Sequence, residues 1–128
     1  MTIRIVRLGF ARAPDEGTRL GTVRRPPRGV PKTDFAKADW YDVWYPVLAP
    51  SPELMKLGQA AKTDKHWAAF FKKYRAEMAA AAPSQSLDVL AALSQHASFS
   101  LGCYCEVEQR CHRSQLRALL LERGAQLE

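Results

Sequence analysis

The order of apolar and polar positions along the chain predicts short strands alternating with helices. Short runs of apolar and β-branched residues predict strands, and apolar residues recurring every three to four positions predict helices. By these patterns we expect strands at 2–8, 41–45 and 98–105, helices at 64–81, 86–95 and 114–122, and a further helix beginning at Ser51–Glu53. The segment at 41–45, which ends at Pro46, also fits an aromatic loop packed over the core.

The segment at 64–81 has the clearest helical period. Its apolar side chains form a single stripe, made of Trp67, Phe70, Phe71, Tyr74 and Met78. A stripe of this kind is typical of a face packed on the hydrophobic core, so we assign it to the core and not to a cofactor site.

Helices placed between strands favour a parallel sheet. We therefore expect one α/β domain over residues 1–128, with a small, mainly parallel sheet flanked by helices. Residues 9–38 are rich in Gly, Pro and Arg without a sustained period, so they are expected to form one long basic loop within that domain. A loop of this length in a small domain is more often functional than idle.

The composition is that of an ordinary soluble protein, with 47% hydrophobic and 25% charged residues in 128. No apolar run approaches the roughly 20 residues that span a bilayer, so no membrane partner is expected. The first residues lack the apolar core of a signal peptide, which indicates a cytoplasmic protein. Three clustered cysteines do not suit the disulfide framework of a secreted domain.

The net charge of +6 is concentrated in one quarter of the chain. Residues 1–32 contain eight basic and two acidic side chains, whereas the remaining 96 residues contain eleven of each. Such asymmetry indicates an anionic partner such as a phosphate, a nucleotide or a nucleic acid, although a solvated basic surface explains it equally well.

All three cysteines lie in one short segment near the C-terminus, between the last expected strand and the last expected helix. This segment runs Cys103-Tyr-Cys105-Glu106-Val-Glu-Gln-Arg-Cys111-His112-Arg113. In α/β proteins, binding sites form at the carboxyl ends of strands and beside helix N-termini. We therefore take Cys105, Glu106, Cys111, His112 and Arg113 as candidate catalytic residues, and Cys103 as a core residue.

Four interpretations of this cluster stay open: a metal site, a redox pair, an anion site with an activated thiol, and a purely structural role. Zinc suits the ligand types, but Cys-x-Cys on a strand and two adjacent ligands at Cys111 and His112 are poor zinc spacings, so we expect no bound metal and no cofactor. A thiol at a helix N-terminus beside His112 and Arg113 would be partly ionised. Alkylation is therefore expected to be fast at Cys111 or Cys105 and slow at Cys103. We also expect His112 to be the pH-sensitive group, with Glu106 orienting one ring nitrogen.

Three parts of the chain resemble a bacterial family of uncharacterised proteins, domain of unknown function 488 (DUF488). The first is the cysteine segment, from Cys105-Glu106 to Cys111-His112-Arg113-x-x-Leu116. The second is the basic segment Arg24-Arg25-Pro26-Pro27-Arg28-Gly29-Val30, and the third is the block from Trp44 through Leu54 with the aromatic stripe that follows. The resemblance implies a bacterial cytoplasmic protein with the fold of that family, and it implies no known reaction.

The two unusual polar regions are most simply parts of one site. We expect Arg24, Arg25 and Arg28 to lie over the carboxyl end of the last strand and to bind phosphate, with the cysteine segment as the floor. This predicts a domain that binds an anionic small molecule or nucleotide and that has groups suited to catalysis. The alternative is a nucleic-acid-binding accessory protein that stacks bases on Trp40, Tyr41, Trp44 or Tyr45. A pocket around the cysteines favours the first, and a flat basic face favours the second.

Overall fold

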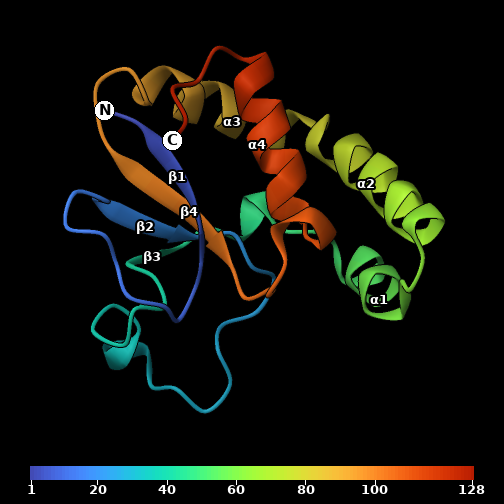
Figure 1. The fold of residues 1–128 in the computed structure, drawn as a ribbon, viewed down its shortest axis with the longest axis horizontal. Coiled ribbons are helices and arrows are strands. Elements are labelled where there is room, and N and C mark those ends of the chain that lie inside the picture. Colours follow the sequence, from blue (N-terminus) through green and yellow to red (C-terminus); the bar gives the residue numbers. More distant parts are fainter.

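Four parallel strands form a single sheet in the order β1-β4-β2-β3, as seen in a computed structural model that describes residues 1–128 (Figure 1). The strands are β1 (Ile3–Arg7), β2 (Thr18–Gly21), β3 (Val43–Trp44) and β4 (Phe99–Cys103). The last strand in sequence, β4, inserts between the first two. All five of its residues are buried, because partner strands cover both edges and packed side chains cover both faces. The predicted α/β fold with a parallel sheet is confirmed.

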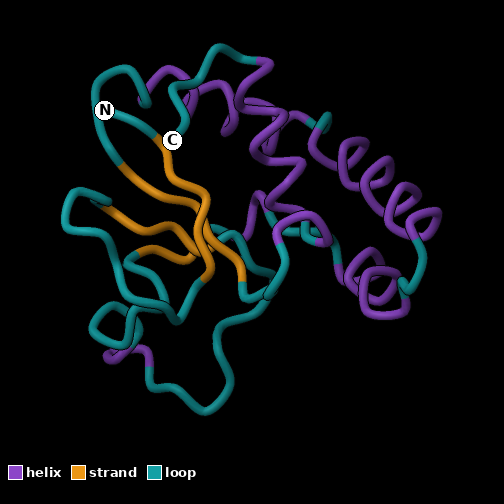
Figure 2. The backbone as a smooth tube through the Cα atoms, viewed as in Figure 1, coloured by secondary structure: helices purple, strands orange, loops and turns teal.

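Four helices gather on one side of the sheet in Figure 1, and Figure 2 shows the loops that cover its lower part. The helices are α1 (Pro52–Ala60), α2 (Asp64–Met78), α3 (Ala81–Leu93) and α4 (His112–Glu122). Single turns of 3-10 helix lie at Lys32–Asp34, Pro46–Leu48 and Glu108–Arg110. None of these helices combines the length and the apolar character that crossing a membrane requires.

Local sequence signals account for several helix boundaries. Ser51 caps α1 by accepting a hydrogen bond from the Leu54 amide, as its position before a proline predicts. Gly124 follows the last helix with φ of 78°, which is the left-handed conformation of a C-terminal stop. The start of α3 is earlier than predicted, at Ala81, because Pro83 lies in the first turn, where a missing N–H breaks no helical hydrogen bond.

The loop predicted over residues 9–38 is wrong in one respect, because β2 lies inside it. The strand has only four residues, too few to show a period, and it owes its place to pairing with β4, in which Leu20 lies opposite Leu101. Gly17 makes the turn into β2 with φ of 79°. A Cβ at Gly17 would lie 2.0 Å from the carbonyl oxygen of Ser98, so no other residue fits this approach of the turn to β4.

Two hydrophobic clusters form the interior. The larger one lies between the sheet and the helices, and it includes Phe70, Tyr74 and Met78 of the predicted stripe, with Trp67 and Phe71 packed at its edge. The smaller cluster is built around the carboxyl end of β4 and consists of Leu8, Val23, Tyr41, Cys103 and Cys111. The cysteine segment is therefore part of a second core, between β4 and the loops that follow β1 and β2.

Candidate functional site

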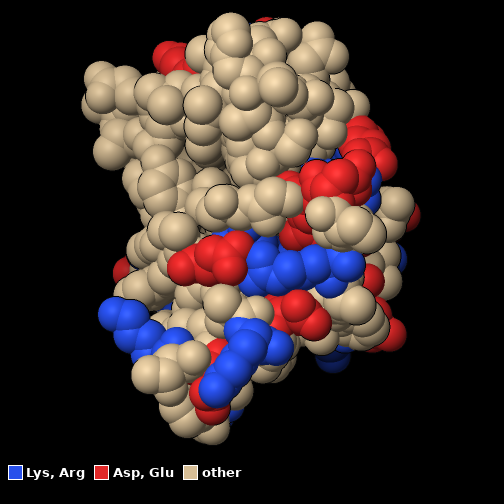
Figure 3. All heavy atoms as spheres, turned by 90° about the vertical axis from the view of Figure 1, so that its left-hand side faces the viewer, with Lys and Arg blue, Asp and Glu red and all other residues tan.

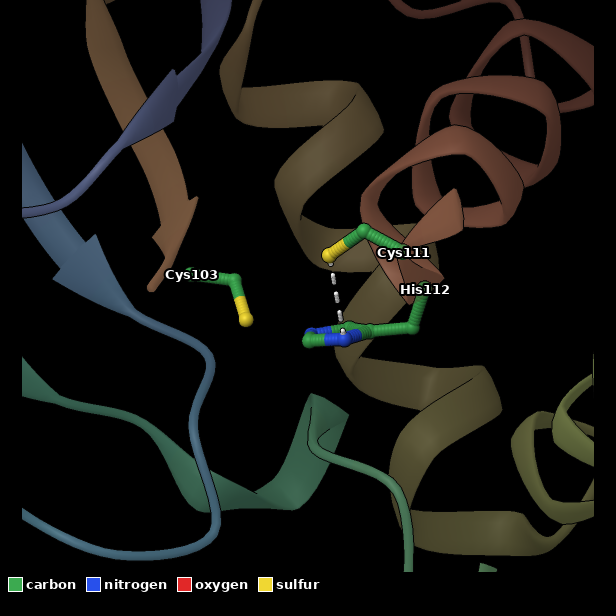
Figure 4. A group of neighbouring side chains, drawn as sticks. All are labelled: Cys103, Cys111 and His112. Atoms are coloured by element: carbon green, nitrogen blue, oxygen red, sulfur yellow. Dashed lines mark hydrogen bonds between the residues drawn. The ribbon is translucent and has the colours of Figure 1, made fainter. Parts of the chain in front are cut away.

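The cysteine segment is a junction between β4 and α4. Cys103 is the last residue of the strand, and His112 is the first residue of the helix, with Cys111 in extended backbone immediately before it. The chain turns back between them, so that donor atoms of Cys103, Cys111 and His112 all lie within 4.8 Å of one another (Figure 4). All three residues are buried.

His112 is held by a backbone carbonyl and not by the carboxylate that the sequence suggested. Its Nε2 lies 2.8 Å from the Thr22 carbonyl oxygen, which can only accept, so Nε2 donates its N–H there. Nδ1 then presents its lone pair toward the Cys111 Sγ, 3.7 Å away. Glu106 is exposed and contacts neither ring nitrogen. The expectation that Glu106 orients His112 is therefore wrong, because the loop carries that side chain out to solvent.

The three thiols differ sharply in acidity. Hydrogen bonds from Cys103 and Cys105 lower the pKa of Cys111 well below its ordinary value of 9.0, against the effect of burial. The same contacts with Cys105 and Cys111 raise the pKa of Cys103 far above its ordinary value. The Cys103 hydrogen bond lowers the pKa of Cys105, but Cys111 and burial outweigh it, so this pKa rises to about 11. The group therefore favours one thiolate, on Cys111.

Arg113 is buried beneath the segment. Its Nη2 donates to the Cys105 carbonyl oxygen at 2.7 Å, which holds the loop after β4 against the start of α4. Its Nε is buried without a hydrogen-bond partner. Four of the five candidate catalytic residues, Cys105, Cys111, His112 and Arg113, thus lie together, while Glu106 lies apart.

A pocket of about 1020 Å³ opens beside the cysteines. Its lining includes Cys103, Cys105 and His112 of the cysteine segment together with Arg24, Arg25 and Arg28 of the basic loop. The Tyr104 hydroxyl donates to the Arg25 carbonyl oxygen at 2.8 Å, which fixes the basic segment to the end of β4. The structure thus places the basic loop and the cysteine segment side by side.

The arginines of this loop differ in their contacts. The guanidinium of Arg24 donates to the carbonyl oxygens of Pro46, Ala49 and Pro50, so it anchors the loop to the segment before α1. Arg25 and Arg28 are exposed and have no acidic partner.

Residues far from both motifs complete the pocket. Lys56 comes from α1, and Arg7 comes from the end of β1, where its guanidinium lies 4.4 Å from the centre of the Phe10 ring. Trp40 and Tyr104 form an aromatic wall, with ring centres 5.8 Å apart. The role of Arg7, Phe10 and Lys56 could not be predicted, since nothing in the local pattern distinguishes them from surface residues. Tyr104 lies within the cysteine segment, but that its ring lines the pocket depends on the fold.

Seven of the eight basic residues in 1–32 fall into two groups, and Lys32 belongs to neither. Arg4, Arg12 and Arg19 form ion pairs with acidic residues. Consistently, basic and acidic side chains lie side by side on the face shown in Figure 3. The other group lines the pocket and consists of Arg7, Arg24, Arg25 and Arg28.

A family model described as "Active DUF488-N3 subclade" matches residues 3–124. The chain belongs to the DUF488 family. This confirms the resemblance seen in the cysteine segment, the basic loop and the central block. No curated protein and no solved structure matches the chain.

The aromatic residues expected to stack nucleic-acid bases are dispersed in the DUF488 chain. Tyr41 is only 2% exposed and belongs to the smaller core cluster, while Trp40 lines the pocket. Trp44 is exposed on β3, with its indole N–H donating to the Val23 carbonyl oxygen. Tyr41 cannot stack on a base while buried, so the proposed stacking surface loses one of its four members.

Proposed function

We propose that this DUF488 protein binds an anionic small molecule of the nucleotide class in the pocket beside the cysteines. One observation carries the proposal: the residues lining the pocket include five permanently basic side chains and no carboxylate. The basic residues are Arg7, Arg24, Arg25, Arg28 and Lys56. A concave site lined by one sign of charge concentrates ligands of the opposite sign.

The pocket walls support an anion that also has an apolar or aromatic part. Trp40 and Tyr104 offer ring faces and edges, and Phe10 and Met55 add apolar surface. A pocket of about 1020 Å³ accommodates a molecule of nucleotide size. We assign the exposed guanidiniums of Arg25 and Arg28 to phosphate groups, because planar guanidiniums bind phosphate oxygens in pairs.

The floor of the pocket supplies the groups that would act on a bound ligand. Cys105 is half-buried and lines the pocket, so its sulfur is the accessible nucleophile. His112 also lines the pocket, and Arg113 supports the loop from beneath. Arg24 acts as the anchor of the basic loop in this proposal, since its donors are already engaged.

The proposal is tested by titrating the protein with ATP, ADP and inorganic phosphate while recording tryptophan fluorescence. We expect saturable quenching by the nucleotides, and Trp40→Phe should remove most of the signal because Trp40 lines the pocket. Arg28→Gln should weaken nucleotide binding about tenfold, the effect of about one charge-assisted hydrogen bond at an exposed site. Lys72→Gln is the matched control, since Lys72 is exposed on α2 and outside the pocket.

Two outcomes count against the proposal. One is a fluorescence signal that none of the three anions changes. The other is nucleotide binding that Arg28→Gln and Lys72→Gln affect equally. Tight binding of a single-stranded oligonucleotide, with no binding of ATP, would instead favour the nucleic-acid alternative.

A further inference from the structure

The side chains of Cys103, Cys111 and His112 converge on one point, and this arrangement suits metal binding, a role separate from anion binding in the pocket. In Figure 4 the Cys103 sulfur points from the end of β4 toward the imidazole of His112, and the Cys111 sulfur faces the same ring from the start of α4. Two soft sulfur donors and one imidazole nitrogen, within 4.8 Å of one another, form the ligand set that zinc prefers in proteins.

The distances agree with a tetrahedral ion. Zinc bonds to sulfur at about 2.3 Å and to nitrogen at about 2.0 Å, so its sulfur and nitrogen ligands lie about 3.5 Å apart and two sulfurs about 3.8 Å apart. The Cys111 Sγ lies 3.7 Å from the His112 Nδ1. Small side-chain rotations would bring the Cys103 Sγ into the same coordination sphere.

The surroundings of His112 are those of a metal ligand. A ligating histidine usually donates its second N–H to a carbonyl or carboxylate, which fixes the ring and the tautomer. Here Nε2 donates to the Thr22 carbonyl oxygen at 2.8 Å, leaving the lone pair of Nδ1 directed to the side of Cys111. The imidazole is therefore already oriented for coordination through Nδ1.

Two features of the spacing counted against zinc: Cys-x-Cys on a strand, and adjacent ligands at Cys111 and His112. Neither applies in the folded protein. Cys103 contributes from the end of β4, whereas Cys105 lies in the loop after the strand and outside the group of donor atoms within 4.8 Å of one another. Cys111 has extended backbone, with φ of −150° and ψ of 152°, whereas His112 begins the helix. This change of conformation brings two adjacent side chains toward one point.

We propose that Cys103, Cys111 and His112 bind one zinc ion, with Cys105 outside the coordination sphere. Bound through two thiolates, the divalent ion forms a neutral centre that adds no charge to the basic pocket. Three protein ligands leave a fourth position open, as in catalytic zinc sites. Cys103 and His112 line the pocket, which provides the route by which the ion enters.

The test is a titration of the reduced protein with Co²⁺, followed by zinc analysis of protein prepared without chelator. Cobalt bound to thiolates in a tetrahedral site gives visible d–d bands and a sulfur-to-cobalt charge-transfer band, which report the ligands directly. We expect one equivalent of cobalt, displaced by one equivalent of zinc. Cys103→Ser and Cys111→Ser should each lose this spectrum, while Cys105→Ser and His96→Gln should keep it.

Circular dichroism of each variant shows whether it is folded, and the wild-type titration decides the question even if a variant is not. The absence of the charge-transfer band in folded wild-type protein overturns the proposal. A spectrum that survives Cys103→Ser, or is lost in folded Cys105→Ser, overturns the ligand assignment. Nucleotide binding, read from Trp40 fluorescence, is a separate measurement, so either proposal can fail without the other.

Discussion

Cys105 and Cys111 differ in the two properties that set the reactivity of a thiol, its exposure and its acidity. Cys111 has the lowered pKa, but it is 1% exposed and belongs to the smaller core cluster. Cys105 is half-buried and lines the pocket, but its pKa is raised to about 11. Reagents must reach a sulfur before its ionisation matters, so access decides the order of reaction.

We expect iodoacetamide to label Cys105 first in metal-free protein, with Cys103 and Cys111 labelled only after denaturation. Because the thiolate is the reacting form, labelling of Cys105 near pH 7 should be about a hundredfold slower than that of a free cysteine, and it should rise with pH until about 11. Peptide mass spectrometry at a series of pH values measures this. Rapid labelling of Cys111 near neutral pH would contradict the burial described here.

Helix α1 shows how one element joins the pocket to the rest of the fold. Its outer face contributes Met55, Lys56 and Gln59 to the pocket lining. Its N-terminus is tied to α2, because the Ser51 amide donates to Glu77 Oε1 at 2.9 Å and the Ser51 hydroxyl donates to Glu77 Oε2. A single residue thus caps α1 and fixes its position against α2.

Ser51→Ala should lower the free energy of unfolding by about 1–2 kcal/mol, since it removes an N-cap and leaves the Glu77 carboxylate with one partner fewer. Chemical denaturation followed by circular dichroism measures the change. Ser86→Ala, a substitution within α3 at a serine with no capping contact, should have little effect. Equal losses in the two variants would show that the cap contributes nothing specific.

At the scale of the whole molecule, a buried ion pair holds the strands and loops together. Arg19 is 1% exposed and Glu16 is 3% exposed. The guanidinium donates to Glu16 and also to the carbonyl oxygens of Phe10 and Asp39, while Ser100 of β4 donates to Glu16. The pair therefore connects β2, β4 and two loops in the interior of the protein.

This pair predicts how stability depends on pH. Burial opposes the ionisation of Glu16, but the hydrogen bonds from Arg19 and Ser100 outweigh it and hold its pKa below the ordinary value of 4.5. A lowered pKa in the folded state means that the pair stabilises the protein fully above pH 4.5, and that this stability is lost as the pH falls through the lower, folded value. Acid titration of unfolding free energy should show that loss.

Glu16→Gln should cost about 3–5 kcal/mol at neutral pH, because it leaves the Arg19 charge buried without its partner. It should also flatten the acid dependence. Asp15→Asn is the matched control: Asp15 pairs with Arg4 at 79% side-chain exposure, where an ion pair contributes little. A Glu16→Gln protein as stable as Asp15→Asn would show that the pair is not a determinant of the fold.

The predictions from sequence succeeded where a signal is local. The stripe of Phe70, Tyr74 and Met78 and the cap at Ser51 depend on residues within a few positions of one another, so their pattern is visible in the chain. The prediction failed for β2, because four residues show no period and their pairing partner β4 lies some 80 positions away. It also failed for Glu106, whose direction depends on how the loop after β4 turns.

The α/β class, the four helices and the location of every thiol at one junction can all be read from the chain alone. These features follow from periodicity and composition, which depend only on residues close together in the chain. The folded structure was needed to show that β4 lies between β1 and β2, and that Arg7, Trp40 and Lys56 join the basic loop around one pocket. The folded structure was also needed to identify the accessible thiol and the carbonyl that orients His112. Contacts between residues far apart in the chain set all of these, and no local pattern encodes them.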